Sequence, residues 1–413
     1  MTHYKLIGTF HQLLPLANLP LKGALKDQQL ELISDAGILL KNNKIHAVGK
    51  FEEMYTRAKA LKAEIIEIEQ GGVVLPAFVD CHTHICFGGS RANDYALRNA
   101  GATYLDIAKS GGGIWDTVQK TRLSTHDELV AGIVARANRH LRQGVTTIEV
   151  KSGYGLSVAE ELKMLRAIQQ ARSSTVVDLI PTCLAAHIFP KDYDGTVADY
   201  LREMTHTLFP ILQQEQLANR VDAFIEEEAF TPTAIEPYFA KAKLMDFAIT
   251  VHADQFSPGG SKVAVDFEAI SADHLEASGA VEIERLAKSN VVAVALPGAT
   301  IGLGCPFTPA RKILDAGGAL AIASDWNPGS APMGDLLTQA AILGTFQKLS
   351  NAEVLAGLTF RAAAALQLSD RGSLQRGNVA DFCIFPTTHF NEILYQQGQL
   401  KPSQVWKNGQ LAT

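Results

Sequence analysis

The stretch that decides the fold is Val73-Val74-Leu75-Pro76-Ala77-Phe78-Val79, followed by Asp80-Cys81-His82-Thr83-His84. The apolar run predicts a buried strand over residues 73–79. Because side chains alternate along an extended chain, His82 and His84 point to the same side. Two imidazoles at the carboxyl end of a buried strand are suited to bind a divalent metal ion. His-X-His also occurs by chance, so this hypothesis depends on the rest of the chain.

Apolar runs alternate with helical stretches along the middle of the chain, which predicts an α/β protein with a parallel sheet. The candidate strands are residues 73–79, 145–150, 176–182, 221–225, 246–251, 270–273, 291–296 and 319–323. Eight such units in 413 residues favour a (β/α)8 barrel. The active sites of such barrels lie at the carboxyl ends of the strands, so the polar residues that follow each strand are the candidates for function.

Both ends of the chain contain short β-type segments. A hairpin is predicted around Asn42-Asn43, and residues 379–385 alternate as a strand does. Neither end alone has enough strands for a stable sheet, so we expect the two ends to pair. The predicted organisation is a small β-sandwich domain made of residues 1–74 and 375–413, beside a barrel domain of residues 75–374.

The composition excludes several classes of protein. The net charge of −6 and the lack of a basic stripe argue against nucleic-acid binding. No apolar run approaches the roughly 20 residues of a membrane span, so no membrane partner is expected. The N-terminal segment does not have the pattern of a signal peptide. Five scattered cysteines without a Cys-X-X-Cys pair indicate a reduced, cytoplasmic setting.

Four side chains at the ends of predicted strands could meet around one ion: His82, His84, His252 and Asp325. Three imidazoles and one carboxylate suit Zn²⁺, and Fe or Mn also accept such ligands. The ion would lower the pKa of a bound water to around 7, and Asp325 could accept the proton of that water. The alternative role for Asp325 is a helix N-cap, but its company of three histidines favours a ligand.

His274 follows the sixth predicted strand and has three interpretations: a fifth ligand, a polariser of a carbonyl group, or a core histidine hydrogen-bonded to Asp273. We favour a polariser and proton shuttle, which makes His274 catalytic together with Asp325. No lysine lies in residues 221–226, which favours one ion over two. Seven other histidines are expected on helix surfaces and loops and receive no role: His3, His11, His46, His126, His140, His206 and His389.

The arrangement of these motifs resembles the amidohydrolase superfamily of metal-dependent (β/α)8 hydrolases, in which both chain ends form a small β domain. A narrower resemblance to the imidazolonepropionase family rests on five ordered segments, namely residues 87–93, 151–156, 186–187, 251–255 and 324–330. It implies hydrolysis of the small molecule 4-imidazolone-5-propanoate to N-formimidoyl-L-glutamate in histidine degradation. It further implies one Zn or Fe ion per subunit, and it allows for a homodimer.

The resemblance also implies the residues that contact the substrate. Arg91 would grip the propionate group, since a guanidinium can bind a carboxylate with two hydrogen bonds. The other implied contacts are Tyr154, His187, Gln255, Asn327, Gly329 and Ser330. Each has an ordinary alternative: Arg91 as a surface arginine, His187 as a packing histidine, and Asn327-Pro328-Gly329-Ser330 as a simple turn.

Gln255 departs from the pattern, because some relatives carry glutamate three residues after the fifth-strand histidine. A glutamine can form hydrogen bonds but cannot act as a base at neutral pH. Gln255 therefore receives a binding role only, and His274 and Asp325 must supply any acid or base function.

Two competing hypotheses remain. The first is another cyclic amidohydrolase or a deaminase, and Glu276, two residues after His274, is compatible with a deaminase. Arg91 and Tyr154 favour an acidic substrate instead. The second is a barrel that has lost catalysis and serves as a scaffold, which predicts a broken ligand set. All four candidate ligands are intact in the sequence.

Overall fold

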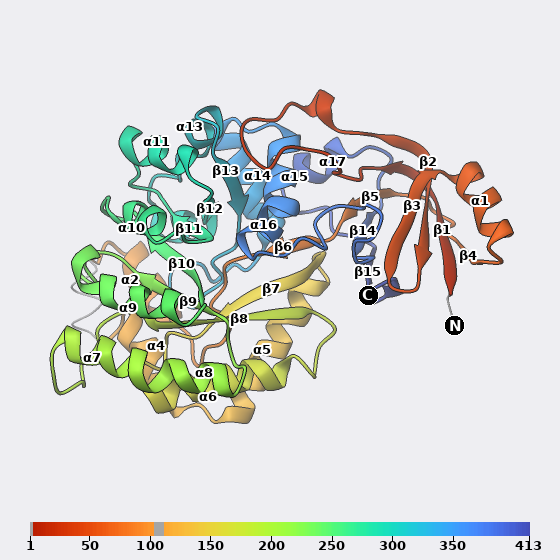
Figure 1. Cartoon of the computed structure of the whole chain (residues 1–413). Coiled ribbons are helices and arrows are strands. Elements are labelled where there is room, and N and C mark those ends of the chain that lie inside the picture. Colours follow the sequence, from red (N-terminus) through yellow and green to blue (C-terminus); the bar gives the residue numbers. More distant parts are fainter. Residues whose placement is uncertain (1–2, 103–110) are drawn as a thin grey trace.

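The computed structural model describes residues 3–102 and 111–413 and contains two sheets, which lie next to each other in Figure 1. One sheet has eight parallel strands in the order β13-β12-β11-β10-β9-β8-β7-β6, which confirms the predicted barrel. Its strands are β6 (Phe78–Asp80), β7 (Val145–Lys151), β8 (Asp178–Ala186), β9 (Arg220–Phe224), β10 (Ala248–Ala253), β11 (Ser271–His274), β12 (Val292–Ala295) and β13 (Ala319–Ile322).

The first and last strands of this barrel meet just beyond their carboxyl ends. Thr83 and Trp326 form an isolated parallel bridge. The N–H of Asp325 donates to the carbonyl of His82 at 3.0 Å, and the N–H of His84 donates to the carbonyl of Trp326 at 3.0 Å. Closure of the barrel therefore brings the His-X-His segment directly against Asp325.

The expected first barrel strand, residues 73–79, is divided in the structure. β5 (Val73–Pro76) belongs to the second sheet, and only β6 belongs to the barrel. Pro76 has no N–H group to donate to a partner strand. Directly after it, the N–H of Ala77 donates to the carbonyl of Asp381, the residue before β14, at 3.1 Å. The N–H of Phe78 donates to the carbonyl of Gly144, the residue before β7, at 2.9 Å. The chain thus changes sheets at Ala77.

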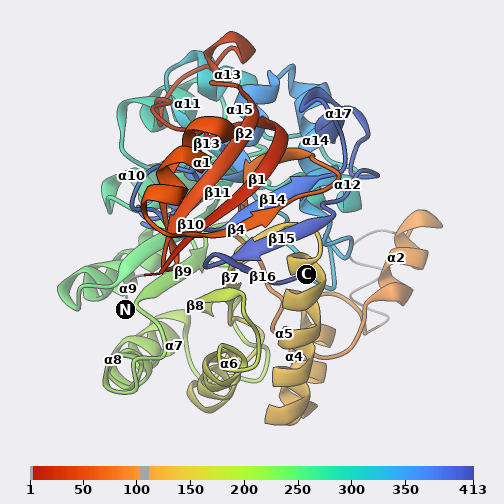
Figure 2. The same cartoon turned by 90° about the vertical axis from the view of Figure 1, so that its right-hand side faces the viewer.

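Both chain ends contribute to the second sheet, which is mixed and has the order β16-β15-β14-β5-β1-β2-β3, with β4 paired to β1. Figure 2 shows this sheet facing the viewer. Its remaining strands are β1 (Tyr4–Leu13), β2 (Ile33–Lys41), β3 (Lys44–Lys50), β4 (Glu64–Glu67), β14 (Phe382–Phe385), β15 (Gln404–Lys407) and β16 (Gln410–Leu411). The hairpin at Asn42-Asn43 is confirmed, because Lys41 pairs with Lys44.

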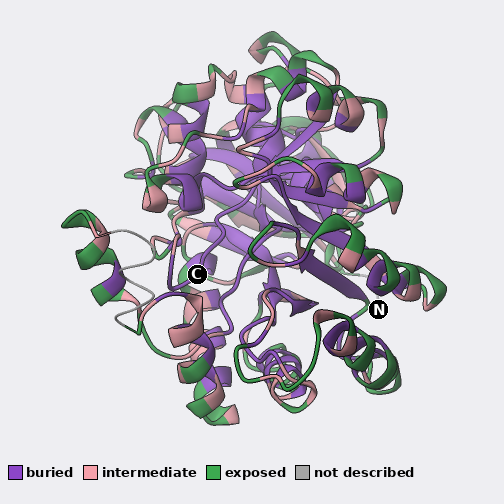
Figure 3. Ribbon diagram, turned by 90° about the vertical axis from the view of Figure 1, so that its left-hand side faces the viewer, coloured by how far each residue is buried: buried purple, intermediate pink, exposed green. Residues whose placement is uncertain are grey.

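Most helices surround the barrel, with exposed outer faces and buried faces toward the strands (Figure 3). The α-helices of the described residues are α1 (Phe51–Ala60), which packs on the second sheet, α2 (Ala92–Asn99), α4 (Ile114–Leu123), α5 (His126–Leu141), α6 (Val158–Ala171), α7 (Val197–Glu203), α8 (Phe209–Gln214), α9 (Pro232–Leu244), α10 (Gly260–Asp266), α11 (Ala280–Lys288), α12 (Pro297–Leu303), α13 (Ala310–Asp315), α14 (Leu336–Gln347), α15 (Asn351–Leu358), α16 (Phe360–Ala365) and α17 (Asn391–Tyr395). None of the described helices has both the length and the apolar character that crossing a membrane requires.

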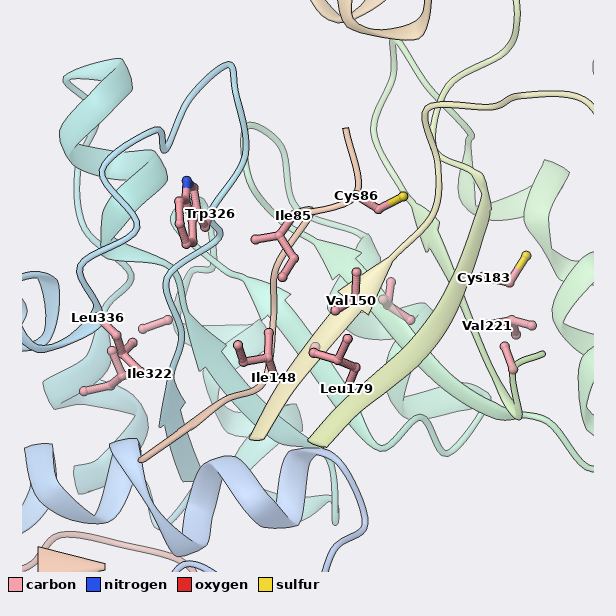
Figure 4. Packing of buried hydrophobic residues seen from close by; sticks show 14 of the residues in the cluster. Ile85, Cys86, Ile148, Val150, Leu179, Cys183, Val221, Ile322, Trp326 and Leu336 are labelled. Carbon is pink, nitrogen blue, oxygen red and sulfur yellow. The ribbon is translucent and has the colours of Figure 1, made fainter. Parts of the chain in front are cut away.

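The two faces of the barrel strands differ in chemistry. Ile148 and Val150 of β7 and Leu179 of β8 belong to the apolar cluster between the strands and the helices (Figure 4). Glu149 and Lys151 alternate with them on β7, and both are fully buried. The inward face of β7 is therefore charged, although barrel interiors are usually filled with branched apolar side chains.

Candidate active site

Three histidines and one aspartate converge at the carboxyl ends of the barrel strands. The Nε2 atoms of His82 and His84 are 3.2 Å apart, and those of His84 and His252 are 3.3 Å apart. Asp325 Oδ1 lies 3.5 Å from Nε2 of His82 and 3.4 Å from Nε2 of His84. All four side chains are buried. Among the described residues, the three histidines form a group with the spacing of metal ligands.

These distances fit a bound metal ion. Four ligand atoms about 2.0–2.1 Å from an ion at tetrahedral angles lie about 3.3–3.4 Å from one another. The Nδ1 atoms of His82 and His252 face carboxylates, so in the neutral rings Nδ1 carries the proton and Nε2 keeps its lone pair. Lone pairs gathered this closely repel one another, and a metal cation or a proton between them removes the repulsion. The three histidines can therefore hold a metal ion.

The electrostatic environment favours neutral His84 and His252 and a charged Asp325. Burial lowers the pKa of His84 and of His252 to about 4. Burial and Lys151 also act to lower the pKa of His82, but hydrogen bonds to Asp273 and Asp325 outweigh them and raise it to about 9. Burial raises the pKa of Asp325, yet its contacts with His82 and His84 hold it well below its ordinary value. Asp325 is thus a carboxylate.

Two aspartates that the sequence reasoning did not assign to the site support the histidines. Asp273 Oδ2 lies 2.6 Å from Nδ1 of His82, and Asp222 Oδ2 lies 2.9 Å from Nδ1 of His252. Asp273 had been considered as a partner of its neighbour His274. The structure contradicts this alternative, which was not the favoured one, because adjacent residues of a strand point to opposite sides and Asp273 faces His82. An aspartate inside a buried strand is unusual and was the signal available in the sequence.

His274 lies beside the histidine cluster. Its ring centre is 5.4 Å from that of His252 and 5.9 Å from that of His82. Its Nδ1 is 3.4 Å from Oε1 of Glu276, and its carbonyl accepts a hydrogen bond from the Thr308 hydroxyl at 2.6 Å. The backbone φ of His274 is +82°, a conformation that costs free energy for a residue with a side chain. Such strained positions are concentrated at functional sites.

The loop that carries Tyr154 is fixed by a buried carboxylate. Glu161 accepts hydrogen bonds from the N–H groups of Gly153, Gly155 and Leu156 at 2.8–3.1 Å. The ring centre of Tyr154 is 5.8 Å from that of His84. Burial raises the pKa of Tyr154, and the negative charge of Asp325 raises it further. Tyr154 therefore keeps its hydroxyl proton and can donate it in a hydrogen bond.

His187 lies directly after β8, against the metal-ligand candidates. Its ring stacks on that of His84 with centres 5.4 Å apart, and its Nδ1 lies 2.9 Å from the carbonyl oxygen of Gly153. With Nδ1–H donated to that carbonyl, the opposite ring nitrogen is an acceptor. Burial places the pKa of His187 well below its ordinary value, so the ring is neutral.

The segment after β13 is both a turn and a wall of the site. Asn327 Oδ1 accepts hydrogen bonds from the N–H groups of Gly329 and Ser330, each at 2.8 Å. Asn327 Nδ2 donates to the carbonyl of Asp325 at 2.7 Å and to Ser330 Oγ at 2.9 Å. Arg91 lies against this turn, because a methyl group added to Gly329 would be 2.2 Å from its Nη1. The structure thus brings Arg91 together with residues 327–330.

Arg91 is held from the other side by Asp94. Its Nε donates to Asp94 Oδ2 at 2.7 Å, and its side chain is only 13% exposed. The same Asp94 oxygen accepts the N–H of Gly113 at 2.8 Å. Arg91 is therefore not a free surface arginine, and Asp94 leaves the two Nη atoms as donors for another group.

Gln255 is half-buried on the segment after β10. Glu226, which follows β9, supports this segment because its Oε1 accepts hydrogen bonds from the N–H groups of Phe256 and Ser257 at 2.8 and 3.3 Å.

His140 was expected on a helix surface, and this expectation was wrong. It is fully buried on the inner face of α5, with Nε2 3.1 Å from Asp80 Oδ2.

Known proteins resemble this chain in sequence and in fold. The sequence pattern described as "Amidohydrolase family" matches residues 73–412 of the chain. In solved structures, the chain superposes on a triazine hydrolase variant with a TM-score of 0.73, at 19% identity over 99% of this chain and 94% of the other. It superposes on a zinc-bound adenosine deaminase from Xanthomonas campestris with a TM-score of 0.69, at 18% identity over 98% of this chain and 92% of the other. At such low identity these two likenesses support the fold alone.

Curated relatives give a closer match. An imidazolonepropionase from Bdellovibrio bacteriovorus is 39% identical over 93% of this chain and 90% of its own length. Imidazolonepropionases from Acinetobacter baumannii and Bacillus cytotoxicus are 38% and 39% identical, and the matches cover 94% and 93% of this chain and 96% and 90% of the relatives. The matches thus cover nearly the full length of both partners. The chain belongs to the amidohydrolase family and, within it, to the imidazolonepropionases.

Proposed function

We propose that the protein hydrolyses 4-imidazolone-5-propanoate to N-formimidoyl-L-glutamate in histidine degradation. Water adds to the ring carbonyl carbon, the C–N bond to that carbon breaks, and the released nitrogen takes up a proton. The observation that carries the proposal is the convergence of the histidine cluster with Arg91, a guanidinium directed toward residues 327–330. A cyclic amide with an acidic side chain needs both features.

We propose His82, His84, His252 and Asp325 as the ligands of one Zn or Fe ion. When bound, the ion supplies the Lewis acidity that makes hydroxide available near neutral pH. Asp325 lies 3.4–3.5 Å from two of the histidines, so its carboxylate is placed to accept the proton of the attacking water. His274, beside His252, would polarise the ring carbonyl and deliver a proton to the leaving nitrogen.

The remaining residues bind and orient the substrate in this proposal. Arg91 forms an ion pair with the propionate through its Nη atoms, which Asp94 leaves available. Tyr154 donates a hydrogen bond from its hydroxyl group, and His187 accepts one at Nε2. The hydroxyl of Ser330 and the backbone of Asn327 and Gly329 contact the carboxylate end of the product. Gln255 forms a hydrogen bond with the ring.

The experiment that tests the proposal is an assay of the purified protein after its metal content has been measured. The ultraviolet absorbance of freshly prepared 4-imidazolone-5-propanoate is followed with and without a chelator. We expect loss of the ring absorbance, formation of N-formimidoyl-glutamate, and inhibition by the chelator. A metal-containing protein that leaves this substrate unchanged, but opens another cyclic amide or deaminates a heterocycle, would refute the substrate assignment.

A further inference from the structure

Lys151, at the carboxyl end of β7, is fully buried and has no part in the roles described above. Its Nζ lies 2.8 Å from Asp222 Oδ2, 2.8 Å from Glu149 Oε2 and 3.8 Å from Asp273 Oδ2. Removing one ammonium and three carboxylates from water carries a large desolvation penalty for each ion. Apolar side chains of similar volume would fill the same space without that penalty. The cluster therefore needs a reason other than stability.

Two of these carboxylates also contact candidate metal ligands, and they do so through the oxygen that faces Lys151. Asp222 Oδ2 is 2.9 Å from Nδ1 of His252, and Asp273 Oδ2 is 2.6 Å from Nδ1 of His82. The two oxygens that face the ring Nδ1 atoms thus also face one ammonium group, at 2.8 Å for Asp222 and 3.8 Å for Asp273. Carboxylates in this position fix the orientation of a metal-binding imidazole.

We infer that Lys151 is a positioning residue for the metal centre, which holds Asp222 and Asp273 so that His252 and His82 present Nε2 to the same ion. This inference rests on the metal site of the proposed function. It adds a role for the lysine of the segment Lys151-Ser152-Gly153-Tyr154-Gly155, of which the proposed function uses only the tyrosine.

The topology of the barrel explains why a lysine can do this. Lys151, Asp222 and Asp273 come from β7, β9 and β11, which are alternate strands of the barrel. Alternate strands contribute side chains to the same interior layer, so a long side chain from one can reach the others. Glu149 lies two residues before Lys151 on the same face of β7 and supplies a further negative charge to the layer.

Without the ammonium group, Asp222 and Asp273 would be two like charges in a buried layer and would lose the cation that faces them both. Their mutual repulsion is poorly screened inside a protein, so they would turn apart. The rings of His252 and His82 would follow, because their Nδ1 atoms lie 2.9 and 2.6 Å from these carboxylates. The expected consequence is weaker metal binding in a barrel that is otherwise folded.

The test compares Lys151→Met with Lys407→Met as a matched control. Lys407 is also a buried lysine between two carboxylates, Asp178 at 2.6 Å and Asp381 at 2.7 Å, but it belongs to β15 of the second sheet. Methionine keeps the length of the side chain and removes its charge. The affinity of each metal-free protein for Co²⁺ is measured by chelator competition. The visible Co²⁺ spectrum reports ligand geometry, and circular dichroism reports folding.

We expect Lys151→Met to bind Co²⁺ about 10-fold or more weakly and with a changed spectrum, since loss of partners behind metal ligands typically costs 10–100-fold in affinity. Lys407→Met should stay within about twofold of the wild type, because it does not contact these partners. If Lys151→Met does not fold, the double variant Glu149→Gln/Lys151→Met removes one charge of each sign and is measured in the same way.

A folded Lys151→Met or Glu149→Gln/Lys151→Met protein with the affinity and spectrum of the wild type would overturn the inference. A wild-type protein that binds no Co²⁺ would refute the metal site itself, and the inference with it. A wild type that binds Co²⁺ but leaves 4-imidazolone-5-propanoate unchanged would refute only the substrate, and the comparison of the two lysine variants would still decide the role of Lys151.

Discussion

Replacing Gly329 by alanine is expected to displace Arg91 and weaken substrate binding. The added methyl group would lie 2.2 Å from Nη1 and 3.0 Å from Cζ of Arg91. Ordinary contact begins at 3.4 Å, so the guanidinium must move by about 1 Å or more. The backbone φ of Gly329 is not in the positive range, so alanine fits the main chain and the turn should persist. The perturbation therefore acts on Arg91.

The size of the effect follows from the bond that is lost. A hydrogen bond to a charged group contributes about 1.5–3 kcal/mol, and each 1.4 kcal/mol corresponds to a factor of ten. We expect KM for 4-imidazolone-5-propanoate to rise about 10- to 100-fold, while metal content is unchanged. The fall in kcat should be smaller, because Arg91 holds the propionate and takes no part in bond breaking.

The assay is the ultraviolet measurement of initial rates across substrate concentrations, made on metal-analysed protein. Gly279→Ala is the matched control, since its methyl group would approach only Glu282 Oε2, at 3.1 Å. In the Arg91→Ala background, Gly329→Ala should raise KM by less than about twofold, because the displaced group is already absent. A wild-type KM in Gly329→Ala, or full additivity with Arg91→Ala, would refute the reasoning.

Three further predictions concern the metal centre and the second sheet. His252→Ala should lose most of its metal and its activity, whereas His126→Ala, at the first residue of α5, should keep both. A wild-type metal content in His252→Ala would refute the assignment of His252 as a ligand. His274→Ala should keep the metal and lose turnover by about 10²- to 10⁴-fold, as expected for a proton-transfer group, and loss of the metal would make His274 a ligand. Burial acts to raise the pKa of Asp178, but the ammonium group of Lys407 outweighs burial, and the pKa in the folded protein is lowered. The charged carboxylate therefore stabilises the fold at a pH above its unfolded pKa of about 3.9. This stabilisation is lost as the pH falls through the folded pKa. Asp178→Asn should therefore lower the melting temperature at pH 7 and should lower it progressively less as the pH falls below about 3.9. A loss that is independent of pH would contradict the ion pair.

Much of the barrel followed from the sequence. Most barrel strands contain a short run of apolar residues, and the polar residues that follow them stand where the structure gathers the candidate site. The predicted third strand ended at residue 182, but β8 continues to Ala186, so His187 follows it directly. The predicted and observed strand ends differ because local sequence contains little information about where strand pairing ends. The division of residues 73–79 between two sheets depends on Gly144 and Asp381, which are distant in sequence.

The sequence by itself determined which residues can carry the chemistry, because ligand and acid–base properties belong to the side chains. His82 and His84 share one side of an extended chain, and this follows from local geometry alone. Only the tertiary structure decided which buried charges meet. Asp273 contacts His82 from across the barrel, and Lys151 reaches Asp222 from an alternate strand. Such contacts depend on barrel closure and strand register, which are set by packing of the whole sheet rather than by any single segment.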